Sequence, residues 1–318
     1  MRIILLLAAW PFLGTFAPLS LQKEMPAPPV SRVAFQPVPL NESAPGQKRL
    51  SELLYLGGWS LTSNDRRFGG ISAIHVEGDE ALAAGDAGWL ARFPVALGGV
   101  VGAEIRAIGS GPGDPSEKSD RDIEAMVVRG NRAWIAFEQA NAVWRYALPG
   151  WRAQSSAVPP AMRQWEANSG PEAMVRLADG RFIVFSEGGG GDSEAVLFSG
   201  DPAVPGTKAT KLRYRPPEGY RITDAAVLPD GRLLFLNRDF SLFGGFSAKL
   251  TLGALPPLRE GALLTGVEIA DFKRPVITDN LEALSVTQDP SGTIVWIASD
   301  DNYTALQRTL LLKFRLLV

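Results

Sequence analysis

Five short phrases of similar sequence decide the fold of this chain. Each phrase opens an apolar run, and in four of the five a carboxylate stands directly before an alanine. The phrases are Ile71-Ser72-Ala73-Ile74, Ile123-Glu124-Ala125-Met126, Pro171-Glu172-Ala173-Met174, Thr223-Asp224-Ala225-Ala226 and Leu281-Glu282-Ala283-Leu284. Successive phrases are roughly 50 residues apart, and a repeat of that length indicates a repeated supersecondary unit.

Within each repeat, a second apolar run follows the phrase, and turn residues such as Arg129-Gly130-Asn131 separate the two. The second repeat contains four extended segments: Ile123–Val128, Arg132–Phe137, Ala142–Leu148 and Trp151–Val158. Four antiparallel strands repeated radially are typical of a β-propeller. We predict an all-β propeller with five four-stranded blades, or six if a long loop hides further strands. A pair of β-sandwiches would leave the repeated phrase unexplained.

The two ends of the chain are expected to meet in one blade. The last repeat shows only three strands, Leu284–Thr287, Ile294–Ala298 and Leu310–Leu317. An N-terminal segment near Leu50–Leu61 supplies the fourth strand. Such closure leaves no free sheet edge.

The N-terminus reads as an export signal. After Arg2, the run from Ile3 to Gln22 carries no charge and has a dense apolar core, as in a secretory signal peptide. We assign residues 1–22 to a signal peptide, 23–48 to a linker and extended segment, and 49–318 to the propeller domain. The expected location is periplasmic or secreted. An uncleaved membrane anchor is the alternative, because about 20 uncharged residues approach spanning length.

Composition excludes several classes of function. The net charge of −2 gives no basic excess for nucleic acid or an anionic membrane, so we expect neither partner beyond the signal segment. The chain has no cysteine and one histidine. Disulfides, thiolate nucleophiles and His-rich metal sites are therefore disfavoured. We expect a monomer that binds a small anionic substrate or ligand.

The repeated acids predict a polar site at one mouth of the propeller channel. First strands line the channel, so their opening carboxylates converge, and burial together raises their pKa values. A hard cation relieves this repulsion, and Ca²⁺ suits oxygen ligands at variable distances. The predicted metal ligands are Glu124, Glu172, Asp224, Glu282, Asp300 and Asp301.

A second polar set follows the second strand of each repeat. It contains Asp86, Glu138, Glu187, the Arg238-Asp239 pair and the Asp300-Asp301-Asn302 run. Adjacent antiparallel strands bring these residues to the same mouth as the first set. We predict Glu187 as general base, and Arg238 and Arg308 as cations that hold an anionic substrate. The alternative is that these acids only tie neighbouring blades together.

The sequence resembles the phytase-like family, also described as "esterase-like activity of phytase". The resemblance spans roughly Gly57 to Val318. It is carried by Gly69–Ala73, Pro171–Ala173, Leu228–Leu234, Asn237–Ser241, Asp279–Ala283, Ser299–Asn302 and Leu306–Leu311. The resemblance implies an exported bacterial β-propeller. Together with the acidic ring, it favours a calcium-dependent hydrolase of phosphoesters or related esters. A non-catalytic periplasmic propeller that binds a ligand or protein is the alternative.

Overall fold

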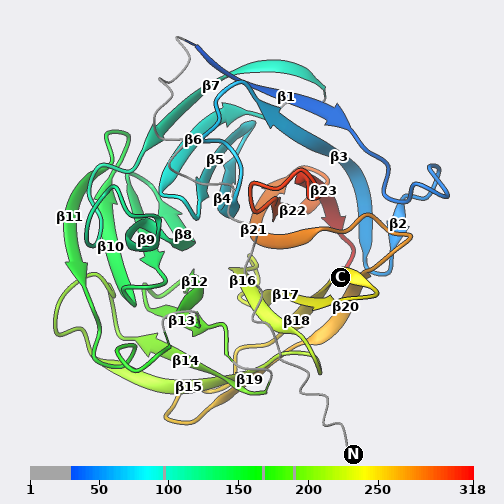
Figure 1. Cartoon of the computed structure of the whole chain (residues 1–318). Coiled ribbons are helices and arrows are strands. Elements are labelled where there is room, and N and C mark those ends of the chain that lie inside the picture. Colours follow the sequence, from blue (N-terminus) through cyan, green and yellow to red (C-terminus); the bar gives the residue numbers. More distant parts are fainter. Residues whose placement is uncertain (1–29, 96–97, 167–168, 189–190) are drawn as a thin grey trace, which may run out of the picture.

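The computed structural model describes residues 30–95, 98–166, 169–188 and 191–318. Their regular structure is almost entirely β, with one short 3-10 helix, η1 (Lys118–Arg121). The strands surround a central axis as in a propeller, which confirms the predicted fold class (Figure 1). No helix in this part of the chain is long and apolar enough to cross a membrane. The predicted signal peptide lies outside the described residues.

The strands of the described residues form four sheets. The largest follows the order β21 (Asn280–Asp289), β22 (Gly292–Asp300), β23 (Thr309–Leu316), β3 (Leu53–Ser63), β1 (Ser31–Pro37), β7 (Gly99–Ala107), β6 (Trp89–Pro94), β5 (Glu80–Gly85), β4 (Ile71–Glu77), with β2 (Arg49–Leu50) paired to β3. The second contains β8 (Ile123–Arg129), β9 (Arg132–Phe137), β10 (Ala142–Ala147) and β11 (Arg152–Ala157). The third contains β12 (Pro171–Arg176), β13 (Phe182–Ser186), β14 (Ser193–Phe198), β15 (Ala209–Arg215) and β19 (Leu263–Thr265). The fourth contains β16 (Arg221–Val227), β17 (Leu233–Ser241), β18 (Gly245–Gly253) and β20 (Val267–Phe272).

The five repeated phrases form the innermost strands. β4, β8, β12, β16 and β21 each neighbour the next around the axis, and β21 returns to β4. We call each inner strand with its hairpin-connected partners a unit, numbered one to five from β4 to β21. Units one and five belong to the same ten-stranded sheet, because β1 pairs with both β3 and β7.

The predicted closure by an N-terminal strand is confirmed. β3 pairs antiparallel with β23 from Leu61 opposite Thr309 to Leu53 opposite Leu316, and so completes unit five. β1 extends this closure outward, although it lies before the predicted start of the propeller domain at residue 49. The strand ladder therefore joins the two ends of the described chain.

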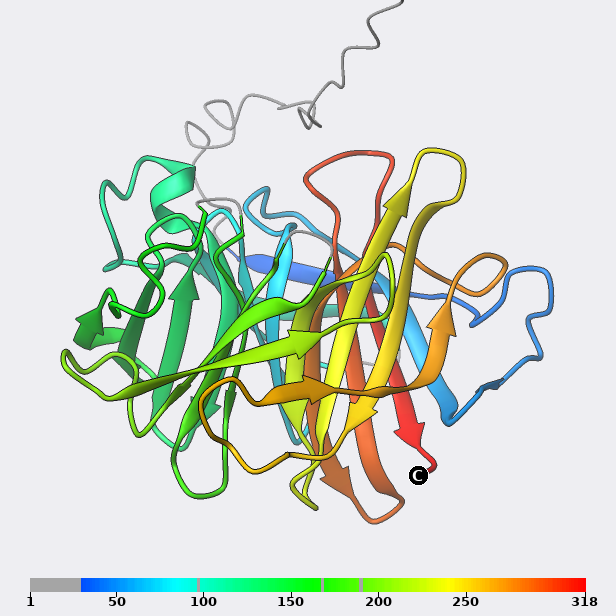
Figure 2. The same cartoon turned by 90° about the horizontal axis from the view of Figure 1, so that it is seen from below.

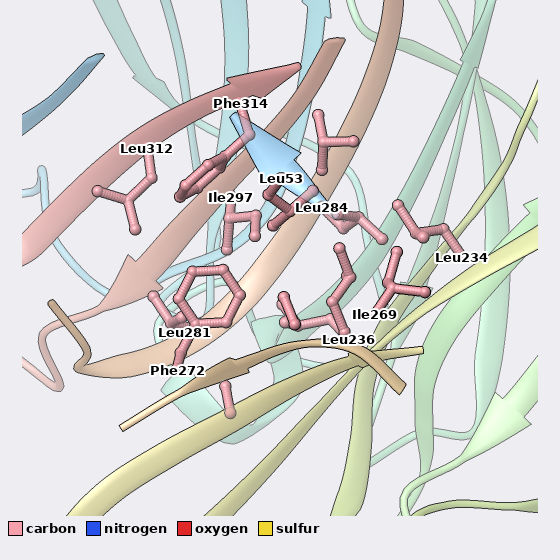
Figure 3. Close-up of a cluster of buried hydrophobic side chains, with 14 of the residues drawn as sticks. Leu53, Leu234, Leu236, Ile269, Phe272, Leu281, Leu284, Ile297, Leu312 and Phe314 are labelled. Atoms are coloured by element: carbon pink, nitrogen blue, oxygen red, sulfur yellow. The ribbon is translucent and has the colours of Figure 1, made fainter. Parts of the chain in front are cut away.

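Apolar side chains fill the spaces between neighbouring units. Five buried clusters are present in the described residues, and each joins the faces of two adjacent units. Between units four and five, Leu236 and Phe272 pack with Leu284 and Phe314 (Figure 3). Complete burial of each such side chain stabilises the fold by about 1.5–3 kcal/mol. The radial hydrophobic packing fixes the inner strands and the groups that they carry.

One end of the channel receives the start of every inner strand and the end of the strand that follows it. We call this end the mouth. The β17–β18 hairpin and the loop between β22 and β23 both project from it, side by side in the upper part of Figure 2.

Candidate functional site

Every inner strand carries a register irregularity near its start. The ladder with the second strand skips one residue in each unit, which produces a bulge that leaves this residue outside the regular pairing. The skipped residues are Ser72, Glu124, Glu172, Thr223 and Glu282. Three carboxylates and two hydroxyl side chains therefore occupy equivalent positions around the mouth.

Two further positions complete each unit's contribution to the mouth. In unit two, the Glu138 amide donates to the Asp122 carbonyl at 2.9 Å, and the same contact recurs between Glu187 and Gly170 in unit three. The equivalent residues pair across the ladder in units four and five. The mouth ring thus consists of Gly70, Ser72, Asp86; Asp122, Glu124, Glu138; Gly170, Glu172, Glu187; Arg221, Thr223, Arg238; and Asn280, Glu282, Asp300.

Unit two supplies the densest group of acids. One carboxylate oxygen from each of Asp122, Glu124 and Glu138 lies within 4.8 Å of the others. Calcium–oxygen bonds of about 2.4 Å would allow one ion to bridge oxygens at that separation. Burial, reinforced by neighbouring acids, raises the pKa of Asp122 to about 7 and that of Glu138 to about 8. Burial also raises the pKa of Glu124 well above its usual value, with Glu172 as the next cause.

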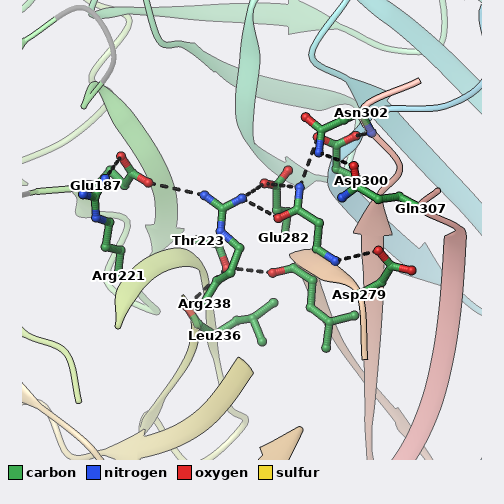
Figure 4. Close-up of polar contacts among 12 residues, drawn as sticks. Glu187, Arg221, Thr223, Leu236, Arg238, Asp279, Glu282, Asp300, Asn302 and Gln307 are labelled. Atoms are coloured by element: carbon green, nitrogen blue, oxygen red, sulfur yellow. Dashed lines mark hydrogen bonds and ion pairs between the residues drawn. The ribbon is translucent and has the colours of Figure 1, made fainter. Parts of the chain in front are cut away.

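Arg238 neutralises the opposite side of the ring (Figure 4). Its Nη1 donates to Glu282 Oε1 at 2.5 Å and to the side-chain oxygen of Asn280. Its Nη2 lies 3.4 Å from Glu187 Oε1, and Arg221 approaches the other oxygen of Glu187 at 3.2 Å. Burial raises the pKa of Glu282, and Arg238 opposes that shift. These contacts place Arg238 among the acids of the mouth ring.

A second protein cation comes from the connection between units one and two. Lys118, in η1, forms an ion pair with Asp86 Oδ2. The other oxygen of Asp86 is buried and has no hydrogen-bond partner. Burial raises the pKa of Asp86, while Lys118 opposes the shift. Among the described residues, no basic side chain forms an ion pair with the remaining acids of units two and three, which are Asp122, Glu124, Glu138 and Glu172.

Glu172 and Asp300 also belong to the mouth ring. Burial, followed by nearby Glu187, raises the pKa of Glu172 well above its usual range. Burial and Glu282 do the same for Asp300. One oxygen of Asp300 accepts the Asn302 amide at 2.6 Å, and the other accepts from Asn280 at 3.4 Å.

Three other predicted site residues make structural contacts. Asp224 accepts the backbone amides of Ala225 and Leu284, each at 2.7 Å, and so ties unit four to unit five. Asp301 accepts the Gly70 amide at 2.9 Å and the Thr309 hydroxyl at 2.7 Å. Both oxygens of each carboxylate therefore accept hydrogen bonds from protein groups.

Arg308 has its ion pairs with Glu42 at 3.3 Å and Asp279 at 3.5 Å. Neither partner belongs to the mouth ring. These ion pairs tie the last unit to the N-terminal segment.

The position of Asp224 differs from the prediction because the fourth phrase is offset by one residue. Thr223 occupies the bulge, and Asp224 takes the place of the alanine that follows it elsewhere. A sequence signal for this offset exists: the Leu-x-Asp-Gly-Arg turn begins at both Leu177 and Leu228. Counting five residues back from each leucine reaches Glu172 and Thr223.

Sequence reasoning also missed Asp122, Lys118 and Asn280 as members or partners of the ring. Asp122 and Asn280 both lie two residues before a bulged glutamate, so their shared spacing was a usable signal. No such sequence signal identified Lys118, because its contact with Asp86 depends on the path of the connection after β7.

Similar proteins were found at the levels of family and fold. The phytase-like family, with the description "Esterase-like activity of phytase", matches residues 66–303. No functionally curated protein sequence matches the chain.

Solved structures with a similar arrangement include three proteins of low identity. A candidate 6-phosphogluconolactonase from Bacteroides uniformis is 14% identical, with 88% of this chain and 94% of that chain covered and a TM-score of 0.41. Glutaminyl cyclase from Myxococcus xanthus is 10% identical, covering 78% and 90%, with a TM-score of 0.44. The Malassezia sympodialis allergen Mala s 1 is 10% identical, covering 77% and 92%, with a TM-score of 0.45. The family match over most of the length shows that this chain belongs to the phytase-like family.

Proposed function

We propose that this chain is a divalent-cation-dependent hydrolase of phosphoesters or related esters, with its site at the propeller mouth. The observation that carries the proposal is the Asp122, Glu124 and Glu138 group, whose oxygens approach within 4.8 Å of one another. The family description, esterase-like, favours a hydrolase-type propeller.

The donor set fits a hard cation. All three side chains offer carboxylate oxygens, the ligand type that Ca²⁺ prefers. Their raised pKa values indicate that the ionised forms lack sufficient compensation from the protein. We propose Ca²⁺ at this group, with Glu172 beside it. A bound divalent cation supplies Lewis-acid polarisation of a phosphoryl or carbonyl oxygen and a lower pKa for water.

The chain's own residues supply substrate orientation. Arg238 is fixed by Glu282, Asn280 and Glu187, so its guanidinium has little freedom to reorient. Arg221 shares Glu187, but nearly half of its side chain is exposed. We propose that Arg221 and Arg238 attract the anionic part of the substrate.

Proton transfer requires a carboxylate near these groups. Glu187 is the base expected from the sequence, but both of its oxygens face arginines. We propose that Glu187 positions those arginines and that Glu172 accepts the proton of the attacking water. Burial and nearby Glu187 raise the pKa of Glu172, and a bound cation would favour its ionised form, which can accept a proton.

The test compares hydrolysis of p-nitrophenyl phosphate, p-nitrophenyl acetate and phytate with calcium and with EDTA. Glu124→Gln should remove the calcium-dependent rate, and Glu172→Gln should lower kcat by about 10²-fold or more. Glu104→Gln, the same chemical change on exposed β7, is the matched control.

Rates that are equal in EDTA and calcium, or unaffected by Glu124→Gln, would exclude the proposed site. If Glu187→Gln lowers kcat more than Glu172→Gln with KM unchanged, Glu187 is the base. Absence of hydrolysis despite calcium binding would favour the non-catalytic ligand-binding propeller.

A further inference from the structure

The three most exposed large apolar side chains among the described residues lie at the mouth. Phe243 is 104% exposed, Leu306 is 96% exposed and Leu242 is 81% exposed. Phe243 and Leu242 form the tip of the β17–β18 hairpin, and Leu306 lies in the neighbouring β22–β23 loop. Both elements project at the same end in Figure 2. Exposed apolar groups concentrated on one face of a molecule mark an interaction site.

The hairpin presents its tip through a defined turn. Ser241 pairs with Gly245, and the Gly244 amide donates to the Ser241 hydroxyl at 2.9 Å. Gly245 has a φ of 72°, which favours glycine. Below the tip, the rings of Phe240 and Phe246 pack with centroids 4.8 Å apart. Local contacts therefore support the outward display of Leu242 and Phe243.

Both apolar tips lack charge. No Asp, Glu, Lys or Arg occurs between Phe240 and Ala248, or between Asn302 and Gln307. The net charge of −2 likewise gives no drive for adsorption to anionic lipid. Any surface that accepts these tips must do so by burying apolar area.

The first residues of β1 lie on the mouth face. β1 pairs with β3 so that Val33 lies opposite Ser63, at the same end where Leu61 lies opposite Thr309. The first described strand therefore begins on the face that carries the apolar tips.

We propose that the mouth face docks on a lipid surface through insertion of Leu242, Phe243 and Leu306. Two neighbouring, projecting apolar tips suit a fluid bilayer interface, in which aromatic and leucine side chains are readily buried (Figure 2). A stable protein interface buries about 800 Å² from each partner, whereas the strongly exposed large apolar side chains described on this face number three, on two loop tips. Docking in this orientation would place the mouth ring over the lipid headgroups, independently of the ring's catalytic activity.

The experiment uses single cysteines, since the chain has none of its own. Full-length Leu242→Cys and Leu306→Cys are labelled with the environment-sensitive fluorophore NBD. Val267→Cys, 75% exposed on β20, is the matched control. Each is mixed with phosphatidylcholine vesicles, with or without phosphatidylglycerol and doxyl-lipid quenchers.

We expect blue-shifted emission and doxyl quenching at 242 and 306, with neither at 267. The response should be similar with and without phosphatidylglycerol and unchanged by moderate salt. Unchanged emission at 242 and 306, or an equal response at all three sites, would overturn the proposal. A blue shift without vesicles that grows with protein concentration would instead assign the tips to contact between two copies of the chain.

Discussion

Asp122→Asn should stabilise the metal-free protein at alkaline pH while removing its response to calcium. Asp122 stands in the acidic group of unit two, where burial and Asp86 raise the pKa of its carboxyl to about 7. The substitution keeps an oxygen acceptor and removes the charge. It therefore imitates the protonated side chain that the metal-free fold prefers.

The direction of the pH dependence follows from proton linkage. The folded state holds the Asp122 proton to about pH 7, whereas the unfolded state releases it near the ordinary value of 3.8. The folded protein then binds more protons, so stability is greatest below 3.8 and falls as pH rises through about 7. Asparagine does not titrate, so the variant should lose less stability across that window.

The pKa of the Asp122 carboxyl rises from 3.8 to about 7 on folding. At 1.36 kcal/mol for each tenfold change in the proton equilibrium, this corresponds to at most about 4 kcal/mol in the free energy of unfolding. Part of this reflects repulsion by the Asp86 carboxylate, which remains in the variant. We therefore expect a gain of about 1–3 kcal/mol at pH 8, or roughly 2–10 °C in Tm.

The assay is thermal and urea unfolding at pH 5 and pH 8, in EDTA and in millimolar CaCl₂. At pH 8 in EDTA the variant should have a higher Tm and a larger free energy of unfolding than the wild type. At pH 5 this difference in stability should be smaller. Calcium should raise the Tm of the wild type and of Glu104→Gln, but not that of Asp122→Asn. A variant less stable than the wild type at pH 8 in EDTA would refute the reasoning, because it would show that the charge of Asp122 does not destabilise the metal-free fold.

Three further substitutions test the surroundings of the ring. Arg238→Met should lower stability by about 3–5 kcal/mol at pH 7.5, because it leaves buried Glu282 unpaired. Urea unfolding should show a smaller loss at pH 5, where more Glu282 is protonated; an equal loss at both pH values would contradict the ion-pair account. Asp224→Asn should cost about 1–3 kcal/mol through its lost contact with the Leu284 amide, with calcium affinity unchanged by calorimetry. Gly70→Ala should lower stability by about 1–3 kcal/mol, since its φ of 58° disfavours a side chain and a Cβ would lie 2.4 Å from a ring carboxylate; an unchanged Tm would contradict this packing.

The repeated phrase was sufficient to predict the propeller, the inner strands and the closure by β3. Periodic apolar runs and turn residues are local features, and they remained consistent over the described chain. β1 was harder to place, because its membership depends on pairing with both β3 and β7 rather than on its own sequence. A strand on the outer edge carries a weaker pattern than one that lines the channel.

The candidate site was predictable where it followed the repeat. Glu124, Glu172 and Glu282 share both the phrase and the bulge. Asp224 shares the phrase but not the bulge, and a one-residue offset changes the direction of a side chain on a strand. Lys118 reaches the ring through a long connection, whose course the local sequence does not specify.

Calcium binding itself is the most direct test of the acidic group as a metal site. Metal-free protein is titrated with CaCl₂ by isothermal calorimetry at pH 7.5, in two buffers of different ionisation enthalpy. The account predicts saturable binding with proton release, because ligands with raised pKa values must ionise. Asp122→Asn and Glu138→Gln should each weaken binding by at least about tenfold. No binding at millimolar calcium, or binding that survives both substitutions combined, would contradict the account.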